Sequence, residues 1–319
     1  MRFDLRAPDF GAPPNSLYRA ALEMAEWADR KGFDLLRISE HHGAEDGYCP
    51  SPLVLAAAFA ARTSRARLRI NALLVPLHDP LRLAEDIAVL DLISNGRAEV
   101  LIGAGYRPSE FAMFGKDIGR RGRLVEEGVA ILRQAWTGEP FEHRGHSVIV
   151  RPRPVQRPHP TILLGGSSAA AARRAARLGL DFVPTHASVY GEYRQARIDL
   201  GHDPGTLSTV GPPFVFVTDD PERLWPQLLP HMLHEANSYA RWAIEGSTAA
   251  VYTPADAASI RAGSQYRVVT PAQCVDLISS LGDGSTFLLH PLVAGIDPDI
   301  AWSSLELFAD QVLPHMSHT

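Results

Sequence analysis

FDLLRISEHHG, residues 33–43, places an apolar run of strand length directly before a cluster of ionisable side chains. A helical pattern over residues 17–30 precedes this run and ends at Lys31-Gly32, a cationic last turn followed by a glycine. A second helix is predicted over residues 52–62, opened by a proline and rich in alanine. Alternating strands and helices of this kind indicate parallel strand pairing with right-handed crossovers.

The same alternation continues over nearly the whole chain. Strands, each followed by a helix candidate, are expected at residues 2–5, 33–38, 68–75, 100–102, 162–164, 181–183, 214–217 and 286–289. Eight such units close most naturally into an α/β fold of the (β/α)8 TIM barrel type, which needs about 250 residues. We therefore expect one domain over residues 1–319, with insertions at about 138–160 and 245–265. A doubly wound sheet is disfavoured because residues 9–15, after the first strand, lack its glycine fingerprint.

Composition limits the classes of function. The chain is 45% hydrophobic and 21% charged, which is typical of a globular protein, and its formal charge is −5. Without a strongly basic stretch, nucleic acid is not an expected partner. The apolar runs are too short for a membrane span, and residues 1–5 lack the features of a signal peptide. Cys49 and Cys274 have no metal-ligand spacing, so a cytoplasmic protein without disulfides is expected.

Candidate site residues follow from the barrel, because the C-terminal ends of its strands line the active site. Four strand ends carry histidine: His41 with His42, His78, His186 and His290. The fifth strand ends in a Gly-Gly-Ser-Ser sequence, residues 165–168, which can bring backbone N–H groups to a phosphate at the start of the next helix. A zinc hydrolase is disfavoured because the first strand has no His-x-His pair, and no metal site is predicted.

Several motifs in order along the chain carry a resemblance to a known family. They are Ser39–Gly43 (SEHHG), residues 76–86 (PLHDPLRLAED), 90–97 (LDLISNGR), 105–107 (GYR), 110–111 (EF), 114–115 (FG), 165–168 (GGSS) and 289–292 (LHPL). Taken together, they resemble the bacterial luciferase-like flavin-dependent monooxygenases.

The resemblance implies a flavin ring over the carboxyl ends of the barrel strands. It assigns catalysis to His41, which would stabilise or protonate the flavin–oxygen intermediate, and to the neighbouring His42. The ring would lie against the third strand, where a cis Asn71–Ala72 bond is implied, and the substrate pocket would include His186 and His290. The expected cofactor-binding residues are Glu40, Asn71, Ala72, Gly103, Tyr106, Arg107, Gly165, Gly166, Ser167 and Ser168.

The same resemblance implies the chemistry. Reduced FMN would react with O2 at C4a to give a hydroperoxide that oxygenates a small, mainly apolar organic substrate. Pro108 stands where a nicotinamide fingerprint beginning at Gly103 would need its third glycine, so a separate flavin reductase is the expected source of reduced FMN. A homodimer is expected through residues 53–62 and 83–92.

Two alternatives stay open. Luciferase has a phosphate-binding arginine where this chain has Ala104, and Arg107 is the candidate replacement. This departure leaves room for coenzyme F420, a deazaflavin that some relatives use for hydride transfer without oxygen. The second alternative is a flavin-binding barrel without catalytic activity.

Overall fold

The structure is a computed structural model that describes residues 1–205, 210–245, 253–282 and 285–316. Its centre is a parallel six-stranded sheet in which the strands pair in the order β1-β2-β3-β4-β7-β8. These strands are β1 (Arg2–Phe3), β2 (Leu35–Ile38), β3 (Arg67–Leu73), β4 (Ala98–Ile102), β7 (Thr161–Gly166) and β8 (Asp181–Pro184). All five residues of β4 are buried, whereas β3 alternates, with Leu68 and Ile70 buried and Arg67 exposed.

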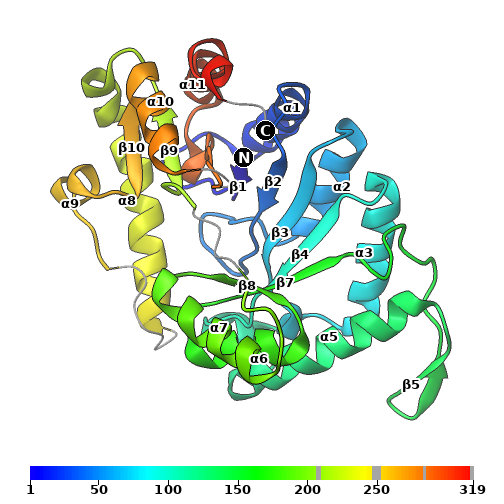
Figure 1. The fold of residues 1–319 in the computed structure, drawn as a ribbon. Helices are drawn as coiled ribbons and strands as arrows, with labels where there is room; N and C mark the ends of the chain where they lie inside the picture. Colours follow the sequence, from blue (N-terminus) through cyan, green and yellow to red (C-terminus); the bar gives the residue numbers. More distant parts are fainter. Residues whose placement is uncertain (206–209, 246–252, 283–284, 317–319) are drawn as a thin grey trace.

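Helices surround this sheet and a second, two-stranded sheet formed by residues 214–217 and 266–269 (Figure 1). They are α1 (Pro14–Arg30), α2 (Pro52–Arg62), α3 (Pro80–Ser94), α4 (Pro108–Met113), α5 (Arg121–Thr137), α6 (Ala169–Leu178), α7 (Tyr190–Asp199), α8 (Pro221–Glu245), α9 (Ala257–Ala262), α10 (Pro271–Ser280) and α11 (Pro298–Gln311). Prolines open several of them, because a first-turn N–H has no partner within the helix. Asn95, Gly138 and Gly179 end α3, α5 and α6 in the left-handed conformation. Parallel strands inside a ring of helices confirm the predicted α/β barrel class.

The predicted eighth strand at residues 286–289 is wrong as a regular strand. Thr286 makes an isolated parallel bridge to Val210, and the carbonyl of Leu289 accepts the N–H of Arg2 at 2.8 Å, which places this segment beside β1. The ladder partner of β9 (Phe214–Val217) is instead β10 (Tyr266–Val269), a strand that the sequence reasoning missed. Its four residues directly follow the stretch that was assigned to an insertion.

The two expected insertion segments contain secondary structure of their own. A short antiparallel hairpin of β5 (Phe141–His143) and β6 (His146–Val148) extends away from the barrel in Figure 1. The second segment contains α9, while residues 246–252 lie outside the described residues. Among the helices that the structure describes, none combines the length and apolar character that crossing a membrane requires.

Candidate functional site

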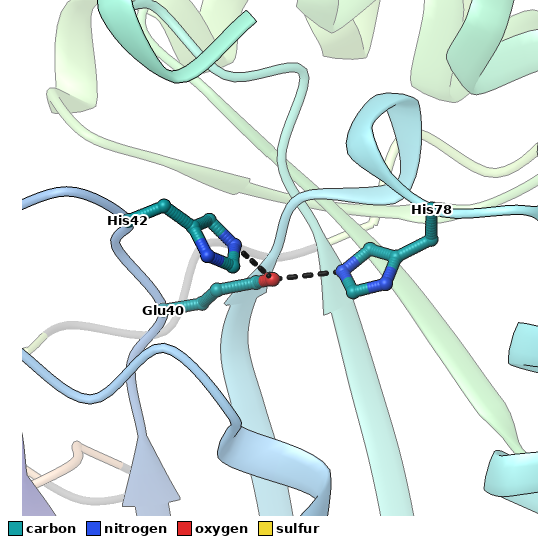
Figure 2. Close-up of side chains that lie close together, drawn as sticks. All are labelled: Glu40, His42 and His78. Carbon is teal, nitrogen blue, oxygen red and sulfur yellow. Dashed lines mark hydrogen bonds and ion pairs between the residues drawn. The ribbon is translucent and has the colours of Figure 1, made fainter. Parts of the chain in front are cut away.

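Glu40 lies just after β2 and joins two histidines from different loops (Figure 2). Its Oε1 lies 2.9 Å from Nε2 of His42 and 2.7 Å from Nε2 of His78, and its Oε2 accepts the N–H of Leu74 at 2.6 Å. Burial alone would raise the pKa of Glu40, but these hydrogen bonds outweigh it and lower the pKa to about 2. An ionised carboxylate only accepts, so both histidines carry their proton on Nε2.

The same three side chains could in principle offer ligand atoms to a metal ion, since those atoms all lie within 4.8 Å of one another. In the structure, they are held together by hydrogen bonds. A metal ion at this position would have to replace the Nε2 protons of both His42 and His78.

His41 is held by Glu110, a residue of α4 that lies 69 positions further along the chain. Oε1 of Glu110 accepts the backbone N–H of His42 at 2.9 Å and lies 2.8 Å from Nδ1 of His41. Because a backbone N–H can only donate, this oxygen is an acceptor, and Nδ1 of His41 donates to it as well. The other ring nitrogen, Nε2, is therefore the one that a neutral His41 can offer to a proton.

Aromatic rings surround His41 and form a feature that we call the aromatic box: Tyr48, Tyr106, Tyr239 and Trp242. Their ring centroids lie 4.8, 5.8, 5.9 and 4.8 Å from that of His41, in the same order. Such rings exclude water and hold the imidazole in one orientation. Trp242 comes from α8, whereas Tyr48 lies in the loop after β2, so the box brings together residues that are far apart in the sequence.

Arg107 braces this arrangement. Its NH1 donates to the carbonyl of His42 at 3.0 Å and lies 3.4 Å from Glu110, and its guanidinium carbon lies 4.4 Å from the centre of the Trp242 ring. Nε lies 3.5 Å from a carboxylate oxygen of Glu245. These contacts tie Arg107 to the His41 motif, and its predicted role at the flavin phosphate stays a prediction.

The end of β3 has the backbone feature that the resemblance implied. The Asn71–Ala72 peptide bond is cis, and the pairing register with β4 shifts at this position. Gly103 accommodates it, because a Cβ on Gly103 would lie 2.8 Å from Cβ of Ala72. A side chain at residue 103 would therefore force one of these two backbone segments to move.

The Gly165–Ser168 segment comprises the last two residues of β7 and the two residues that lead into α6. A Cβ on Gly166 would lie 2.5 Å from Cβ of Ala171, which cannot rotate away, so this position favours glycine; one on Gly165 would meet only a Leu101 methyl group, at 2.5 Å, which can move. Ser168 caps α6 by accepting the N–H of Ala171 at 3.2 Å. Gly165, Gly166 and Ser167 are half-buried and Ser168 is exposed. The segment leads into the N-terminus of α6, a helix of 10 residues, and first-turn N–H groups of a helix are the kind of donor that binds phosphate.

The two histidines expected in the substrate pocket differ in their surroundings. His186 is exposed at the start of η3 (Ala187–Val189), whereas His290 is fully buried. Nε2 of His290 lies 3.5 Å from Asp4 and Nδ1 lies 3.8 Å from Glu235, and burial lowers its pKa to about 4. Neither ring nitrogen has a hydrogen-bond partner within the described part of the chain.

Sequence reasoning missed several residues of this site. Glu110 was noted as part of a motif without a role, and His78 was noted at a strand end without the partner that Figure 2 shows. Tyr48, Tyr239 and Arg6 gave no motif signal, because only the folded chain brings them to the box. The guanidinium carbon of Arg6 lies 5.2 Å from the centre of the Trp242 ring.

Comparison with known proteins gives the class. A sequence model of the family described as luciferase-like monooxygenase matches residues 3–281, so the chain belongs to this family. Relatives include the oxygenase component of a flavin-dependent trigonelline monooxygenase from Acinetobacter baylyi, which is 30% identical over 46% of this chain and 42% of the relative. An FMNH2-dependent dimethylsulfone monooxygenase from Pseudomonas putida is 30% identical over 49% of this chain and 46% of the relative. The chain thus spans about half the length of the curated relatives it matches.

Solved structures match over nearly the whole chain. The monooxygenase RslO1 from Streptomyces bottropensis has a TM-score of 0.75 and 26% identity, covering 99% of both chains. The oxygenating constituent of 3,6-diketocamphane monooxygenase from Pseudomonas putida, solved with FMN, has a TM-score of 0.73 and 22% identity, covering 96% of this chain and 95% of that one. An F420-dependent secondary alcohol dehydrogenase has a TM-score of 0.69 at 16% identity, covering 94% of this chain and 95% of that one, and shows the fold alone.

Proposed function

We propose that this protein is the oxygenase component of an FMN-dependent monooxygenase that acts on a small organic substrate. The observation that carries the proposal is the His41–Glu110 pair inside the aromatic box, in a chain of the luciferase-like family. In the overall reaction, the substrate and O2 react with FMNH2; one oxygen atom enters the substrate, the other leaves as water, and FMNH2 is oxidised to FMN. Reduced FMN supplies the two electrons that activate O2.

The chain offers residues for each part of the flavin. The Gly165–Ser168 loop would hold the phosphate through backbone N–H groups and the Ser168 cap. Asn71, Ala72, Gly103 and Tyr106 would hold the ring at the ends of β3 and β4, and Glu40 would support that wall by fixing Leu74. These assignments are supported by the close approach of Gly103 to Ala72 and of Gly166 to Ala171, where only glycine leaves the backbone open.

His41 would handle the proton that oxygen activation requires. Glu110 accepts from Nδ1 of His41, which leaves Nε2 to hold or release a proton among the rings of the box. Tyr48 and Trp242 would keep water away from this nitrogen. His42 would act with Glu40 in shaping the loop, since its ring faces the carboxylate.

The test is a titration of the purified chain with oxidised FMN, reduced FMN and coenzyme F420, followed by oxygen-consumption assays. We expect reduced FMN to bind and O2 to be consumed. In His41→Ala, turnover should fall, or the O2 that FMNH2 reduces should leave as hydrogen peroxide without oxygenating the substrate. The circular dichroism spectrum should be unchanged. An unaltered rate and unaltered coupling in His41→Ala would remove His41 from the mechanism.

A charge probe locates the phosphate. Ser168→Asp keeps a side chain that caps α6 well but places a negative charge beside the proposed phosphate. FMN affinity should fall while the melting temperature holds. Equal affinity in Ser168→Asp would place the phosphate elsewhere.

Hydride transfer with coenzyme F420 is the second candidate, because Ala104 stands where luciferase has its phosphate-binding arginine. Binding of F420 in preference to FMN, with turnover that needs no oxygen, would select it. Tight flavin binding without turnover on any substrate would select the non-catalytic barrel.

Two partners belong to the proposal. A flavin reductase would supply FMNH2. The trigonelline monooxygenase relative is named as an oxygenase component, which supports a separate reductase here. A second copy of the chain would bind the outer face of α2 and α3, where Val54, Val89, Leu92 and Ile93 are 72, 43, 43 and 47% exposed.

A further inference from the structure

Glu245, the last residue of α8, joins this helix to the start of α4. Its Oε1 accepts the backbone N–H of Ser109 at 3.0 Å, and its Oε2 lies 3.5 Å from Nε of Arg107. Burial alone would raise the pKa of Glu245, but the hydrogen bonds to Ser109 and the charge of Arg107 outweigh burial and lower it. Glu245 is therefore ionised at neutral pH, and one carboxylate ties the end of α8 to the residues that open α4.

Arg107 lies between two carboxylates, those of Glu245 and Glu110. Its side chain is 7% exposed, and the last turn of α8 also supplies Trp242, whose ring centre lies 4.4 Å from the guanidinium carbon. On the other side, NH1 of Arg107 donates to Oε1 of Glu110 at 3.4 Å. One cation is thus shared by two acids, and one of these acids holds His41.

The oxygen that Arg107 reaches is the same one that binds His41. Oε1 of Glu110 lies 2.8 Å from Nδ1 of His41, and it also accepts the N–H of His42 at 2.9 Å. A nearby anion favours the charged form of an imidazole, and a nearby cation disfavours it. Glu110 therefore stabilises an imidazolium at His41, and Arg107 opposes this effect from beside the same oxygen.

The other groups around His41 are uncharged at neutral pH or are paired with one another. Burial raises the pKa of Tyr48 to about 13, and the other rings of the aromatic box carry no charge at pH 7. Behind these rings and beside His42, the ionisable groups form pairs: Arg6 and His234 with Asp46, Arg2 with Asp4 and Glu235, and Glu40 with His42 and His78. The charges that bear directly on the Nδ1 side of His41 are those of Glu110 and Arg107.

We propose that Arg107 is a positioning residue whose charge offsets that of Glu110, so that His41 can release the proton that oxygen activation requires. Glu245 and Trp242 hold the guanidinium in this place. The inference rests on the proposed function, in which His41 handles that proton. It gives Arg107 a role other than the one predicted at the flavin phosphate. Without Arg107, the carboxylate of Glu110 alone would keep His41 protonated up to a higher pH.

The experiment follows the imidazole of His41 by NMR as a function of pH, using the full chain with isotope-labelled histidine and no flavin. His41→Ala identifies the signal among the 13 histidines of the chain. Arg107→Met keeps an apolar side chain against Trp242 but removes the charge, so the midpoint of the His41 titration should rise by about one pH unit. A rise of less than about 0.3, or a fall, would overturn the proposal.

Two further variants separate charge from shape. Arg107→Lys keeps the cation, so the midpoint should stay within about 0.3 of that of the unmodified chain. A rise as large as that in Arg107→Met would assign the effect to shape and contradict the proposal. If Arg107→Met does not fold, Arg107→Gln decides, because its amide can still donate to Glu110 while the same charge is removed.

Arg174→Met is the matched control. Arg174 lies on α6, its side chain is 18% exposed, and its Nε lies 2.9 Å from a carboxylate oxygen of Glu126 on α5. It is therefore an arginine–glutamate pair of the same kind on other elements of the barrel. The His41 midpoint should not move in Arg174→Met, and a rise equal to that in Arg107→Met would contradict a specific role for Arg107.

The outcome separates this inference from the function on which it rests. FMN binding and oxygen consumption test the monooxygenase, whereas the NMR titration needs neither. A raised midpoint in Arg107→Met without FMN binding by the unmodified chain would refute the monooxygenase alone. FMN-dependent turnover with an unmoved midpoint would refute the role of Arg107 alone.

Discussion

Replacing Glu40 by glutamine tests the network that joins the loops after β2 and β3. The folded chain lowers the pKa of Glu40 from 4.5 to about 2. Lowering a pKa by one corresponds to about 1.4 kcal/mol, so the ionised carboxylate contributes about 3 kcal/mol to the free energy of unfolding at pH 7. Glutamine cannot replace it: one of its two ends is an NH2 group, which would face either Leu74 N–H or the two histidines.

The pH dependence gives the sign. Because folding lowers the pKa of Glu40, its contribution is fully present well above pH 4.5 and is lost as the pH falls toward 2. The difference in unfolding free energy between the unmodified chain and Glu40→Gln should be about 3 kcal/mol at pH 7 and about 2 kcal/mol at pH 3.5. Urea denaturation followed by circular dichroism at both pH values measures it.

Glu85→Gln is the matched control, because Glu85 lies on α3 with its side chain 44% exposed. Its substitution should change the unfolding free energy by about 0.5 kcal/mol or less. A Glu40→Gln difference below about 1 kcal/mol at pH 7, or one that does not change with pH, would refute the reasoning.

Three further predictions test other parts of the site. Gly166→Ala places a Cβ 2.5 Å from that of Ala171, so FMN affinity measured by fluorescence quenching should fall; unchanged affinity would separate this loop from the phosphate. Glu110→Gln should slow oxygen turnover about tenfold or more and shift its pH profile, with FMN affinity kept, because His41 loses its anionic partner; an unshifted profile would contradict this. Val54→Asp, at a position 72% exposed on α2, should convert a dimer to a monomer in light scattering, and a dimer that persists would place the interface elsewhere.

Most of the sheet could be predicted because most of its strands contain a short apolar run, such as residues 100–102 of β4. A run of this kind can be recognised from the sequence alone. In the structure, every residue of β4 and of β9 is buried. The sequence reasoning failed at β10, where Arg267 is exposed within a four-residue strand. A usable signal lay next to it: Thr270 and Gln273 form the capping box of α10, a Thr-x-x-Gln pattern that marks a helix start.

The site could be predicted only where it lies at strand ends. His41 follows β2 directly, so the barrel rule alone indicates its position. Its partner Glu110 is 69 residues away, on a helix whose placement depends on the left-handed turn at Gly105. Arg6 is harder still, because a single arginine after a two-residue strand resembles any surface arginine until its surroundings are known.

The order of the six-stranded sheet also bears on how the protein is made. Among these six strands, each one after β1 pairs with the strand that precedes it in the sequence, so the ladder can grow as the chain leaves the ribosome. Leu289, whose carbonyl joins the last segment to β1, is synthesised only near the end. We expect the first two thirds of the chain to assemble its sheet early, and the pocket around His41 to form only once α8 and the segment that carries His290 have been translated.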